Sequence, residues 1–564
     1  MSGRAILRDP LAERLIGPGK PFDLVEEKVG GRPRRVFAGA PRTLSAIYRA
    51  AADTIGDVVV SGEGRFSYAD VFARAGALAA VLRDRYGVGR GDMVALAMEN
   101  RPEFVVAFVA ITAAGACAAL VNSRGVADEM LHAIALTGAR LLVTDAPRAA
   151  AIAEREADPA FDRIVLGETT LRPERDIDFA TACAGVAPLE PIAVGPADGA
   201  VILFTSGTTG FPKGALLSHG AIAHAAALSK MVGTMQDLRY EEETGIALPD
   251  AQRSMSSPTV ILAPMFHMTG VLPIVRTIHT GGTIHILGKW NVDVAFDMLE
   301  TTGLARLSFV PAMLWDMFRS PRATPEMLSR IRFMVNGGAP LAPDLVAEIK
   351  RRTPHCLIVN TYGQSEDSGW ACSISGRTYV DNPQSCGWAV PSVDVIVRRD
   401  DGSAADIGEP GELWVASAAV MTEYLSNADA TREALQDGWL ATGDVGIVDA
   451  DGLFTIVDRK KNMVISGGEN IYCAEVERVV SAHPSVRESI AYGLPDARLG
   501  ERMVVEAVIE TGADLTADDV RAHCREHLAI YKVPRAVLLL NEALPRTASG
   551  KIDRRRIVAH ARSR

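Results

Sequence analysis

The sequence predicts an α/β protein with a large N-terminal domain of parallel sheets, a small β-rich subdomain and a small α+β C-terminal domain. The chain has 564 residues, more than a single hydrophobic core usually supports. Short apolar runs alternate with helical patterns up to about residue 370, which is typical of parallel α/β sheets. Beyond that point the runs are short and separated by turn residues, which predicts a β-rich subdomain.

The N-terminal part supplies the alternating elements. A helical pattern over residues 68–86 precedes an apolar run at 93–98 that predicts a strand. The stretch 104–121 approaches the length of a membrane span, but alanine, glycine and threonine dominate it, so we expect a buried helix that runs into a strand. Further strands are predicted at residues 139–144, 163–167, 259–263, 283–287, 307–310, 332–335 and 356–360.

Residues 231–258 interrupt this alternation with a polar, acidic segment. We expect a disordered surface loop there. A role in a substrate tunnel or in a dimer contact is the alternative, because long loops in compact domains are often functional. A homodimer is therefore possible.

The C-terminal part has a different pattern of predicted elements. Short strands are predicted at residues 393–399, 411–415 and 454–457, with turns at 400–402 and 449–452. Charged residues 458–462 and the glycines after them are typical of a domain boundary. We therefore expect an N-terminal domain over residues 1–458 and a C-terminal α+β domain over residues 463–564, with helices at 475–481 and 517–528 and strands at 488–492 and 503–509.

Composition argues against several classes of protein. A formal net charge of −10 argues against a nucleic-acid binder, because such proteins usually carry basic faces. Seven scattered cysteines form no paired framework, which predicts reduced thiols and a cytoplasmic location. The N-terminus lacks the apolar core of a signal peptide. Cys524 lies between His523 and His527, but no second cysteine pair accompanies them, so zinc is not expected.

Residues 204–214, which read FTSGTTGFPKG, are the most informative segment of the chain. They follow an apolar run at 200–204 that predicts a buried strand. Glycines let the backbone approach an anion closely, and amides, hydroxyls and the Lys213 ammonium supply donors and positive charge. The segment therefore predicts a polyphosphate-binding loop, with a ligand-free turn as the alternative. It is not the common P-loop, because Gly214 rather than serine or threonine follows Lys213.

The order Thr-Ser-Gly-Thr-Thr-Gly-x-Pro-Lys-Gly in this loop closely resembles the phosphate loop of the adenylate-forming superfamily. That superfamily includes acyl- and aryl-CoA synthetases, luciferases and the adenylation domains of peptide synthetases. The resemblance implies an ATP-binding enzyme in which Thr205 also has a catalytic role. The implied nucleotide-binding residues of the loop are Thr205, Ser206, Gly207, Thr208, Thr209, Gly210 and Lys213.

A second segment, residues 360–366 (NTYGQSE), follows a predicted strand, where α/β proteins place their ligands. Tyr362 could stack on a base, and Glu366 could hold Mg²⁺, which prefers carboxylate oxygen. The segment resembles the superfamily's Tyr-Gly-x-Thr-Glu motif, with Ser365 keeping the hydroxyl of the threonine. Glu366 is thus expected to be catalytic. The other implied ATP-binding residues are Asn360, which could bond the exocyclic amine of the base, Thr361, Tyr362 and Ser365.

Two further segments complete the implied nucleotide site. Residues 442–444 (TGD) resemble a motif whose carboxylate binds both ribose hydroxyls, so Asp444 is expected to take that role. Arg459, fifteen residues later, is a further expected ATP-binding residue. Residues 336–340 (NGGAP) resemble the segment that lines the adenine and the acid, although such a sequence is also a routine turn. They supply the expected ATP-binding residues Gly338, Ala339 and Pro340.

The last two segments lie in the C-terminal part. By resemblance, residues 459–462 form a hinge at Lys461 about which a mobile C-terminal domain rotates. Residues 545–552 (PRTASGKI) resemble the superfamily's Pro-x-x-x-x-Gly-Lys segment, which makes Lys551 the candidate catalytic lysine. A cation delivered late stabilises the charge that builds on an attacked α-phosphate. The expected wall of the coenzyme A tunnel is Gly467, Gly468 and Glu469.

The carboxylic acid is expected beside residues 264–270 (PMFHMTG), which resemble the superfamily segment next to the carboxylate. Aminoacyl-adenylating members usually carry aspartate near the position of His267, so an acid without an α-amine is expected. The expected pocket is mostly apolar, which indicates a hydrophobic acid, although core packing explains Phe309 and Met313 equally well. Its expected residues are Phe266, His267, Phe309, Val310, Met313 and Gly337.

Together these segments, in superfamily order from Thr205 to Lys551, imply an AMP-forming acyl-CoA synthetase, an acid–thiol ligase. With ATP, Mg²⁺ and coenzyme A it would convert a hydrophobic carboxylic acid to an acyl-adenylate and then to acyl-CoA. Three alternatives remain open: an enzyme that loads a carrier protein, a luciferase-like oxygenase, and a non-enzymatic binding module. The last would be expected to carry damaged motifs.

Overall fold

The computed structural model describes residues 8–185, 187–205, 212–288, 290–309, 311–337, 341, 343–466, 469–496, 498–547 and 551–563. The chain divides into two compact units. The first unit comprises Met1–Val395, Val415–Ala441 and Asp451–Phe454. The second comprises Ile396–Trp414, Thr442–Ala450 and Thr455–Arg564.

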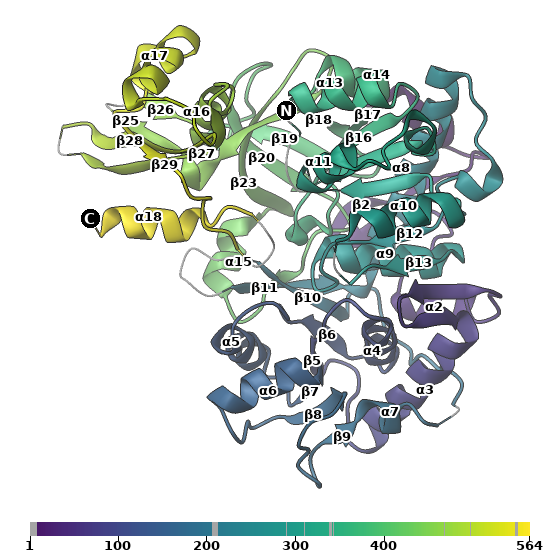
Figure 1. Ribbon diagram of the computed structural model, residues 1–564. Coiled ribbons are helices and arrows are strands. Elements are labelled where there is room, and N and C mark those ends of the chain that lie inside the picture. The colour runs from purple at the N-terminus through teal and green to yellow at the C-terminus, as the bar shows by residue number, and fades with distance from the viewer. Residues whose placement is uncertain are drawn as a thin grey trace. The chain divides into compact units, whose positions relative to one another are not determined.

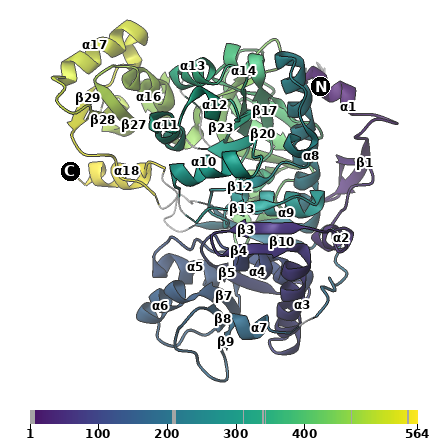
Figure 2. The ribbon, with the colours of Figure 1, turned by 45° about the vertical axis from the view of Figure 1, so that its right-hand side comes forward.

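An eight-stranded sheet in the first unit has the order β21-β11-β10-β6-β5-β7-β8-β9. Its central strands pair in parallel, which confirms the predicted sheet type. Helices α5 and α6 lie on one side of the strands and α3 and α4 on the other (Figures 1 and 2), so the strands are apolar on both faces. The elements are α3 (Tyr68–Asp84), β5 (Met93–Ala97), α4 (Pro102–Ala113), β6 (Cys117–Leu120), α5 (Ala127–Thr137), β7 (Leu141–Asp145), α6 (Ala146–Arg155), β8 (Asp162–Leu166), β9 (Ile177–Asp178), α7 (Phe179–Ala182), β10 (Gly199–Thr205), β11 (Lys213–Ser218) and β21 (Glu423–Tyr424).

The apolar stretch at residues 104–121 forms the buried centre of this sheet. Every residue of α4 except Glu103 is buried, and so is every residue of β6. The expectation of a buried helix that runs into a strand is therefore confirmed. Among the described residues, no helix is both long enough and apolar enough to cross a bilayer.

Two further sheets belong to the first unit. In one, β12, β13 and β3 pair in parallel and β4 is antiparallel to β3. In the other, β14, β15 and β16 pair in parallel, and β17 and β18 continue in antiparallel order. The elements are β3 (Asp57–Ser61), β4 (Gly64–Ser67), β12 (Thr259–Ile261), α9 (Met268–Thr280), β13 (Ile284–Ile286), α10 (Val292–Thr301), β14 (Arg306–Phe309), α11 (Pro311–Arg319), α12 (Pro325–Leu328), β15 (Phe333–Gly337), α13 (Pro343–Arg352), β16 (Leu357–Tyr362), β17 (Cys372–Ser375), α14 (Gly376–Asp381) and β18 (Ser385–Ala389).

The expectation of a disordered loop at residues 231–258 is wrong. Helix α8 (His219–Thr244) runs through half of that segment, and Tyr240 near its end is fully buried. Its polar residues are buried because they have partners. Asp237 forms an ion pair with Arg306, and Arg239 forms one with Asp9 across 2.6 Å. The segment therefore ties distant parts of the chain together.

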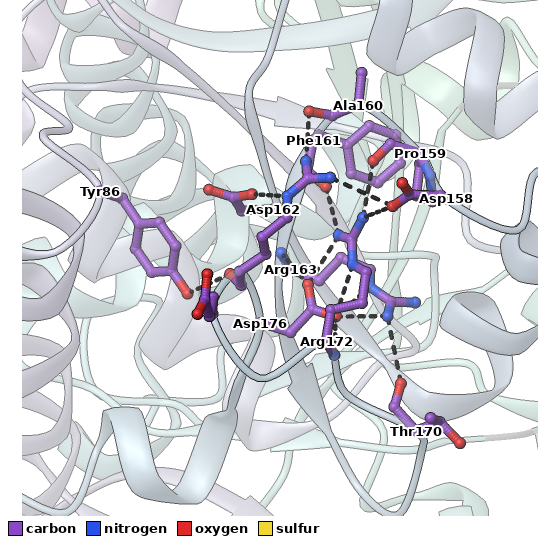
Figure 3. Close-up of polar contacts among 12 residues, drawn as sticks. Tyr86, Asp158, Pro159, Ala160, Phe161, Asp162, Arg163, Thr170, Arg172 and Asp176 are labelled. Carbon is purple, nitrogen blue, oxygen red and sulfur yellow. Dashed lines mark hydrogen bonds and ion pairs between the residues drawn. The ribbon is translucent and has the colours of Figure 1, made fainter.

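A buried ion-pair network holds the strand β8 to the segment before β9 (Figure 3). Both oxygens of Asp176 accept hydrogen bonds, from Arg163 Nη2 at 2.6 Å and from Arg172 Nη2 at 2.9 Å. Burial alone would raise the pKa of Asp176, but these hydrogen bonds outweigh it and hold the pKa well below its usual range. Arg172 also reaches the exposed Asp158, which lies at the surface end of the network.

The second unit contains two β structures. Strands β24, β23, β20 and β19 are neighbours in that order, which confirms the predicted short strands. In the C-terminal part, the β27–β28 hairpin pairs with β29 in parallel, and α16 and α17 contribute Val476, Val480, Val520 and Cys524 to its core. The elements are β19 (Asp394–Arg398), β20 (Gly411–Ala416), β23 (Trp439–Val448), β24 (Phe454–Arg459), β25 (Val464–Ser466), β26 (Glu469–Ile471), α16 (Cys473–Ser481), β27 (Val486–Asp496), β28 (Gly500–Ile509), α17 (Ala517–His527), β29 (Ala536–Leu540) and α18 (Arg554–Arg562).

Candidate active site

The predicted phosphate loop connects the antiparallel strands β10 and β11. Thr205 and Lys213 are cross-strand partners at the end of this hairpin. Both are half-buried. The residues predicted between them, Ser206, Gly207, Thr208, Thr209 and Gly210, lie outside the described residues. The hairpin thus brings Thr205, which carries a hydroxyl, and the cation Lys213 to the same end of the two strands.

Tyr424 links the lysine of this hairpin to the predicted metal-binding carboxylate. The Nζ of Lys213 lies 5.0 Å from the centre of the Tyr424 ring, a cation–π arrangement. The hydroxyl of Tyr424 donates to Oε1 of Glu366 across 2.8 Å. Strand β21, which contains Tyr424, pairs with β11. Three residues from three distant segments therefore form one Lys213–Tyr424–Glu366 chain.

Glu366 lies on a short 3₁₀ turn, η2 (Ser365–Asp367), and is buried. Asp367 holds this turn: its Oδ1 accepts from the backbone N–H groups of Gln364, Gly369 and Trp370 at 2.8, 3.0 and 3.1 Å. Burial raises the pKa of Asp367 to about 7, although these N–H groups oppose the rise. The carboxyl of Asp367 thus acts as a structural acceptor that fixes the direction of Glu366.

Sterics explain why the Tyr-Gly motif has a glycine at position 363. A Cβ atom on Gly363 would lie 2.3 Å from the carbonyl carbon of Gly369. Backbone atoms cannot move away as a flexible side chain can, so only glycine fits this close approach. The loop that carries Glu366 folds back on the end of β16 through this contact.

The predicted base-binding residues lie at the ends of the parallel strands β15 and β16. Asn336 Nδ2 donates to Asn360 Oδ1 across 2.9 Å, and Asn360 Nδ2 donates to the carbonyl of Ser385 across 3.2 Å. A contact from Asn360 to a base would have to use the second lone pair of Oδ1. Gly337 pairs with Thr361 in register, and Tyr362 ends β16. Gly338, Ala339 and Pro340 lie outside the described residues.

The residues predicted for the acyl pocket fall into two groups. Phe266 is buried, and its ring lies 4.5 Å from that of His267, which precedes α9. Phe309 and Met313 pack in the hydrophobic cluster around Met334, so core packing accounts for them. Gly337 ends β15, and Val310 lies outside the described residues. The pocket itself stays a prediction.

In the second unit, the two predicted ribose-site residues lie together. Arg459 Nε is 2.5 Å from Asp444 Oδ1, on the neighbouring strands β24 and β23. Asp444 is buried, whereas the Arg459 side chain is 48% exposed. Thr442 Oγ1 donates to the carbonyl of Leu413 and accepts from the N–H of Asp444. The Thr-Gly-Asp turn is thus fixed by its own threonine.

Lys551 closes the base of a loop in the second unit. The N–H of Thr547 donates to the carbonyl of Lys551 across 2.7 Å, and Arg546 forms a bridge with Ile552. The Lys551 residue is exposed. Neighbouring atoms still desolvate its ammonium in part, and this desolvation, followed by the positive charge of Arg459, lowers the pKa of Lys551.

The other predicted residues of the second unit can be placed only in part. Lys461 lies on an exposed 3₁₀ turn, η3 (Lys460–Asn462). Glu469 begins β26. Gly467 and Gly468, predicted for the coenzyme A tunnel, lie outside the described residues. The hinge and the tunnel stay predictions.

Two important residues were not predicted from the sequence. Tyr424 lies in a two-residue strand whose pairing with β11 no local pattern reveals. Asp367 follows Glu366 directly, and its acceptor role depends on how the loop folds. The signal in the sequence was the pair of acidic residues, Glu366 and Asp367, after the Tyr-Gly motif. This signal does not tell which of the two carboxylates is turned inward.

Comparisons with known proteins identify the family of this chain. A family model described as "AMP-binding enzyme" matches residues 47–425, and one described as "AMP-binding enzyme C-terminal domain" matches residues 475–551. A long-chain-fatty-acid–CoA ligase, FadD13, of Mycobacterium tuberculosis is 31% identical over 87% of this chain and 92% of its own length. A feruloyl-CoA synthase of an Amycolatopsis species is 32% identical over 87% and 93%.

A solved structure extends the comparison. The o-succinylbenzoate–CoA synthetase MenE of Bacillus subtilis, in complex with the acyl-adenylate intermediate, superposes with a TM-score of 0.76 at 26% identity. The match covers 91% of this chain and 97% of that one. Fold and motifs thus define an AMP-forming acid–thiol ligase of the acyl-CoA synthetase type, as predicted. The chain belongs to the AMP-binding enzyme family.

Proposed function

We propose that this enzyme activates a hydrophobic carboxylic acid with ATP at the Lys213–Tyr424–Glu366 chain, and then transfers the acyl group to coenzyme A. The proposal depends on one observation. Tyr424 contacts both Lys213, a cation of the β10–β11 hairpin, and the buried carboxylate of Glu366. A polyphosphate and its counter-ion need these two charges at one place.

In the first step, a carboxylate oxygen of the acid attacks the α-phosphorus of ATP, and the bond to the β-phosphate oxygen breaks. The products are acyl-adenylate and pyrophosphate. Thr205 and Lys213 hold the β- and γ-phosphates, and much of the rate comes from this positioning. Lys551 supplies positive charge to the equatorial oxygens of the transition state. Asp444 binds the ribose hydroxyls, with Arg459 oriented beside it.

Glu366 is the residue that would hold Mg²⁺. Its carboxylate is the hard oxygen donor that this cation prefers, and Tyr424 and the loop fixed by Asp367 orient it. When bound, the cation neutralises charge on the phosphate oxygens.

In the second step, the thiol of coenzyme A attacks the acyl carbonyl and AMP leaves. Three of the protein's own cysteines are poor nucleophiles, since burial raises the pKa of Cys183, Cys356 and Cys473 to about 12 each. We propose that a C-terminal domain over residues 463–564 turns about Lys461, within a hinge at 459–462, between the two steps. Gly467, Gly468 and Glu469 then line the path of the thiol.

The substrate is proposed to be hydrophobic because the residues predicted for its pocket are mostly apolar, and the buried Phe266 lies against His267. FadD13 and the feruloyl-CoA synthase carry names that specify a long-chain fatty acid and an aromatic acid. Both fit an apolar pocket. A cytoplasmic location and a homodimer remain predictions from the sequence.

The test is ATP–pyrophosphate exchange across a panel of carboxylic acids, followed by addition of coenzyme A. We expect exchange that depends on an apolar acid, and AMP and a thioester only after the thiol is added. Transfer to a carrier protein but not to coenzyme A would favour the carrier-loading alternative. Oxygen uptake with light from the acyl-adenylate would favour the oxygenase. No exchange with any acid would contradict the proposal.

Tyr424→Phe should lower the rate of adenylation about tenfold. The change removes a hydrogen bond to a charged group, worth about 1.5 kcal/mol, but keeps the ring beside Lys213. The measurement is pyrophosphate exchange at several concentrations of Mg²⁺ and ATP, where we expect a weaker response to both. Tyr86→Phe is the matched control, because its hydroxyl donates to a backbone carbonyl near β9, that of Arg175. Equal rates for Tyr424→Phe and the unaltered enzyme would exclude this role.

A further inference from the structure

The end of helix α17 gathers three metal-ligating side chains: His523, Glu526 and His527. One ligand atom from each lies within 4.8 Å of the other two. The spacing is i, i+3, i+4, which places all three on one face of a helix. None of them belongs to the motifs assigned to ATP, the acid or coenzyme A. We propose that this cluster binds a divalent transition-metal ion, with Zn²⁺ as the expected ion.

The imidazole tautomers suit such a site. Nε2 of His523 lies 3.0 Å from the carbonyl oxygen of Val479, and Nδ1 of His527 lies 2.9 Å from the carbonyl oxygen of His523. A carbonyl only accepts, so these two nitrogens carry the protons. In the neutral rings, Nδ1 of His523 and Nε2 of His527 therefore carry the lone pairs. Backbone carbonyls that fix the far nitrogen in this way are typical of metal-bound histidines.

The rings are also held in place. The His523 and His527 rings lie 4.5 Å apart between centroids, and the ring of His483 packs edge-on against His523 at 5.2 Å. His523 is half-buried, whereas Glu526 and His527 are exposed. The two exposed side chains would turn toward His523 to bring three ligands to the distances of about 2.0–2.2 Å that zinc requires.

The position on the helix adds to the affinity for a cation. All three residues lie within the last five residues of α17, which ends at His527. The carbonyl end of a helix carries partial negative charge. Two imidazoles and one carboxylate leave at least one coordination position for water or an exogenous ligand. Such a donor set favours Zn²⁺, Ni²⁺ or Cu²⁺ over Mg²⁺.

The site differs from the zinc motif that the sequence analysis set aside. That motif would need the thiol of Cys524, which is fully buried in the core of the second unit. The helix turns Cys524 inward, and Glu526 takes its place as third ligand. A second cysteine pair is not required by a His-Glu-His set.

The experiment is Zn²⁺ titration of the full chain, without an affinity tag and without nucleotide. Millimolar Mg²⁺ is present so that oxygen-only sites are filled. We expect one equivalent of Zn²⁺ to bind, and Co²⁺ in its place to give the d–d absorption of a site with nitrogen ligands. His527→Ala and Glu526→Gln should each weaken Zn²⁺ binding at least about tenfold, since even outer-shell partners contribute that much.

His560→Ala is the matched control, because His560 is an exposed histidine on α18 of the same unit. It should bind Zn²⁺ as the unaltered chain does. Circular dichroism checks that both ligand variants stay folded. The proposal is overturned if the unaltered chain takes up no Zn²⁺, or if all three variants bind it equally well.

Discussion

Lys551→Ala should lower the rate of acyl-adenylate formation by roughly 10²–10³-fold, the loss expected when one group that stabilises transition-state charge is removed. Thioester formation from supplied acyl-adenylate should keep its rate, because that step builds no charge on a pentavalent phosphorus. The measurements are pyrophosphate exchange for the first step and thioester release for the second. Equal loss in both steps would contradict the proposed alternation of the C-terminal domain.

The pH dependence of adenylation gives a second readout of Lys551. Desolvation and the charge of Arg459 lower the pKa of this lysine, so it loses its proton at lower pH than an ordinary lysine. We expect the alkaline fall in adenylation to begin correspondingly early. Lys551→Arg should remove that fall, because a guanidinium stays charged. Arg556→Ala, a nearby exposed cation on α18, should change neither rate nor profile.

Asp176→Asn should destabilise the first unit by about 3 kcal/mol, the low end of the range for breaking a buried ion pair. The amide keeps the shape of the carboxylate but removes the ion-pair partner of the buried Arg163 and leaves Arg172 with only the exposed Asp158 (Figure 3). Arg163 has a side chain only 6% exposed and cannot turn to water. The measurement is urea unfolding at neutral pH, followed by a probe in the first unit.

The effect of Asp176→Asn should depend on pH in a defined direction. The folded-state pKa of Asp176 is depressed, so its stabilisation is fully present above the unfolded pKa of about 3.9 and disappears as pH falls through the folded value. The two proteins should therefore differ by a constant amount from about pH 5 to pH 8 and converge in acid. Asp158→Asn is the control: its side chain is 77% exposed, and less than about 1 kcal/mol is expected. A similar loss from both variants would argue against a special role for the buried carboxylate.

Local sequence features predicted much of the fold. The apolar runs at 93–98 and 356–360 correspond to β5 and β16 within a few residues. Strands that are buried on both faces need continuous apolar sequence, and this signal is local. The predicted phosphate loop between β10 and β11 could also be recognised from the sequence, because its glycines, hydroxyl residues and lysine follow a fixed order after a strand. Asp444 and Arg459 lie on the neighbouring strands β23 and β24, which their spacing in the sequence did not predict.

The segment at 231–258 shows where such reasoning fails. Its acidic and basic residues read as solvent-exposed because their partners lie far away in the chain. Asp237 finds Arg306, and Arg239 finds Asp9. A helix buried on most of its surface also lacks the apolar stripe by which surface helices are recognised. The burial of this helix depends on contacts with residues far away in the chain, which a short stretch of sequence does not contain.

By itself, the sequence determined the type of sheet, the order of the motifs and the class of enzyme, since strands, turns and phosphate loops depend on residues that are neighbours in the chain. Only the tertiary structure decided that Tyr424 joins Lys213 to Glu366, that Asp367 fixes the turn beside it, and that α17 presents two histidines and a glutamate while turning Cys524 inward. The physical reason is that these arrangements depend on strand pairing and on the direction of side chains from a packed core. Both are properties of segments brought together by folding.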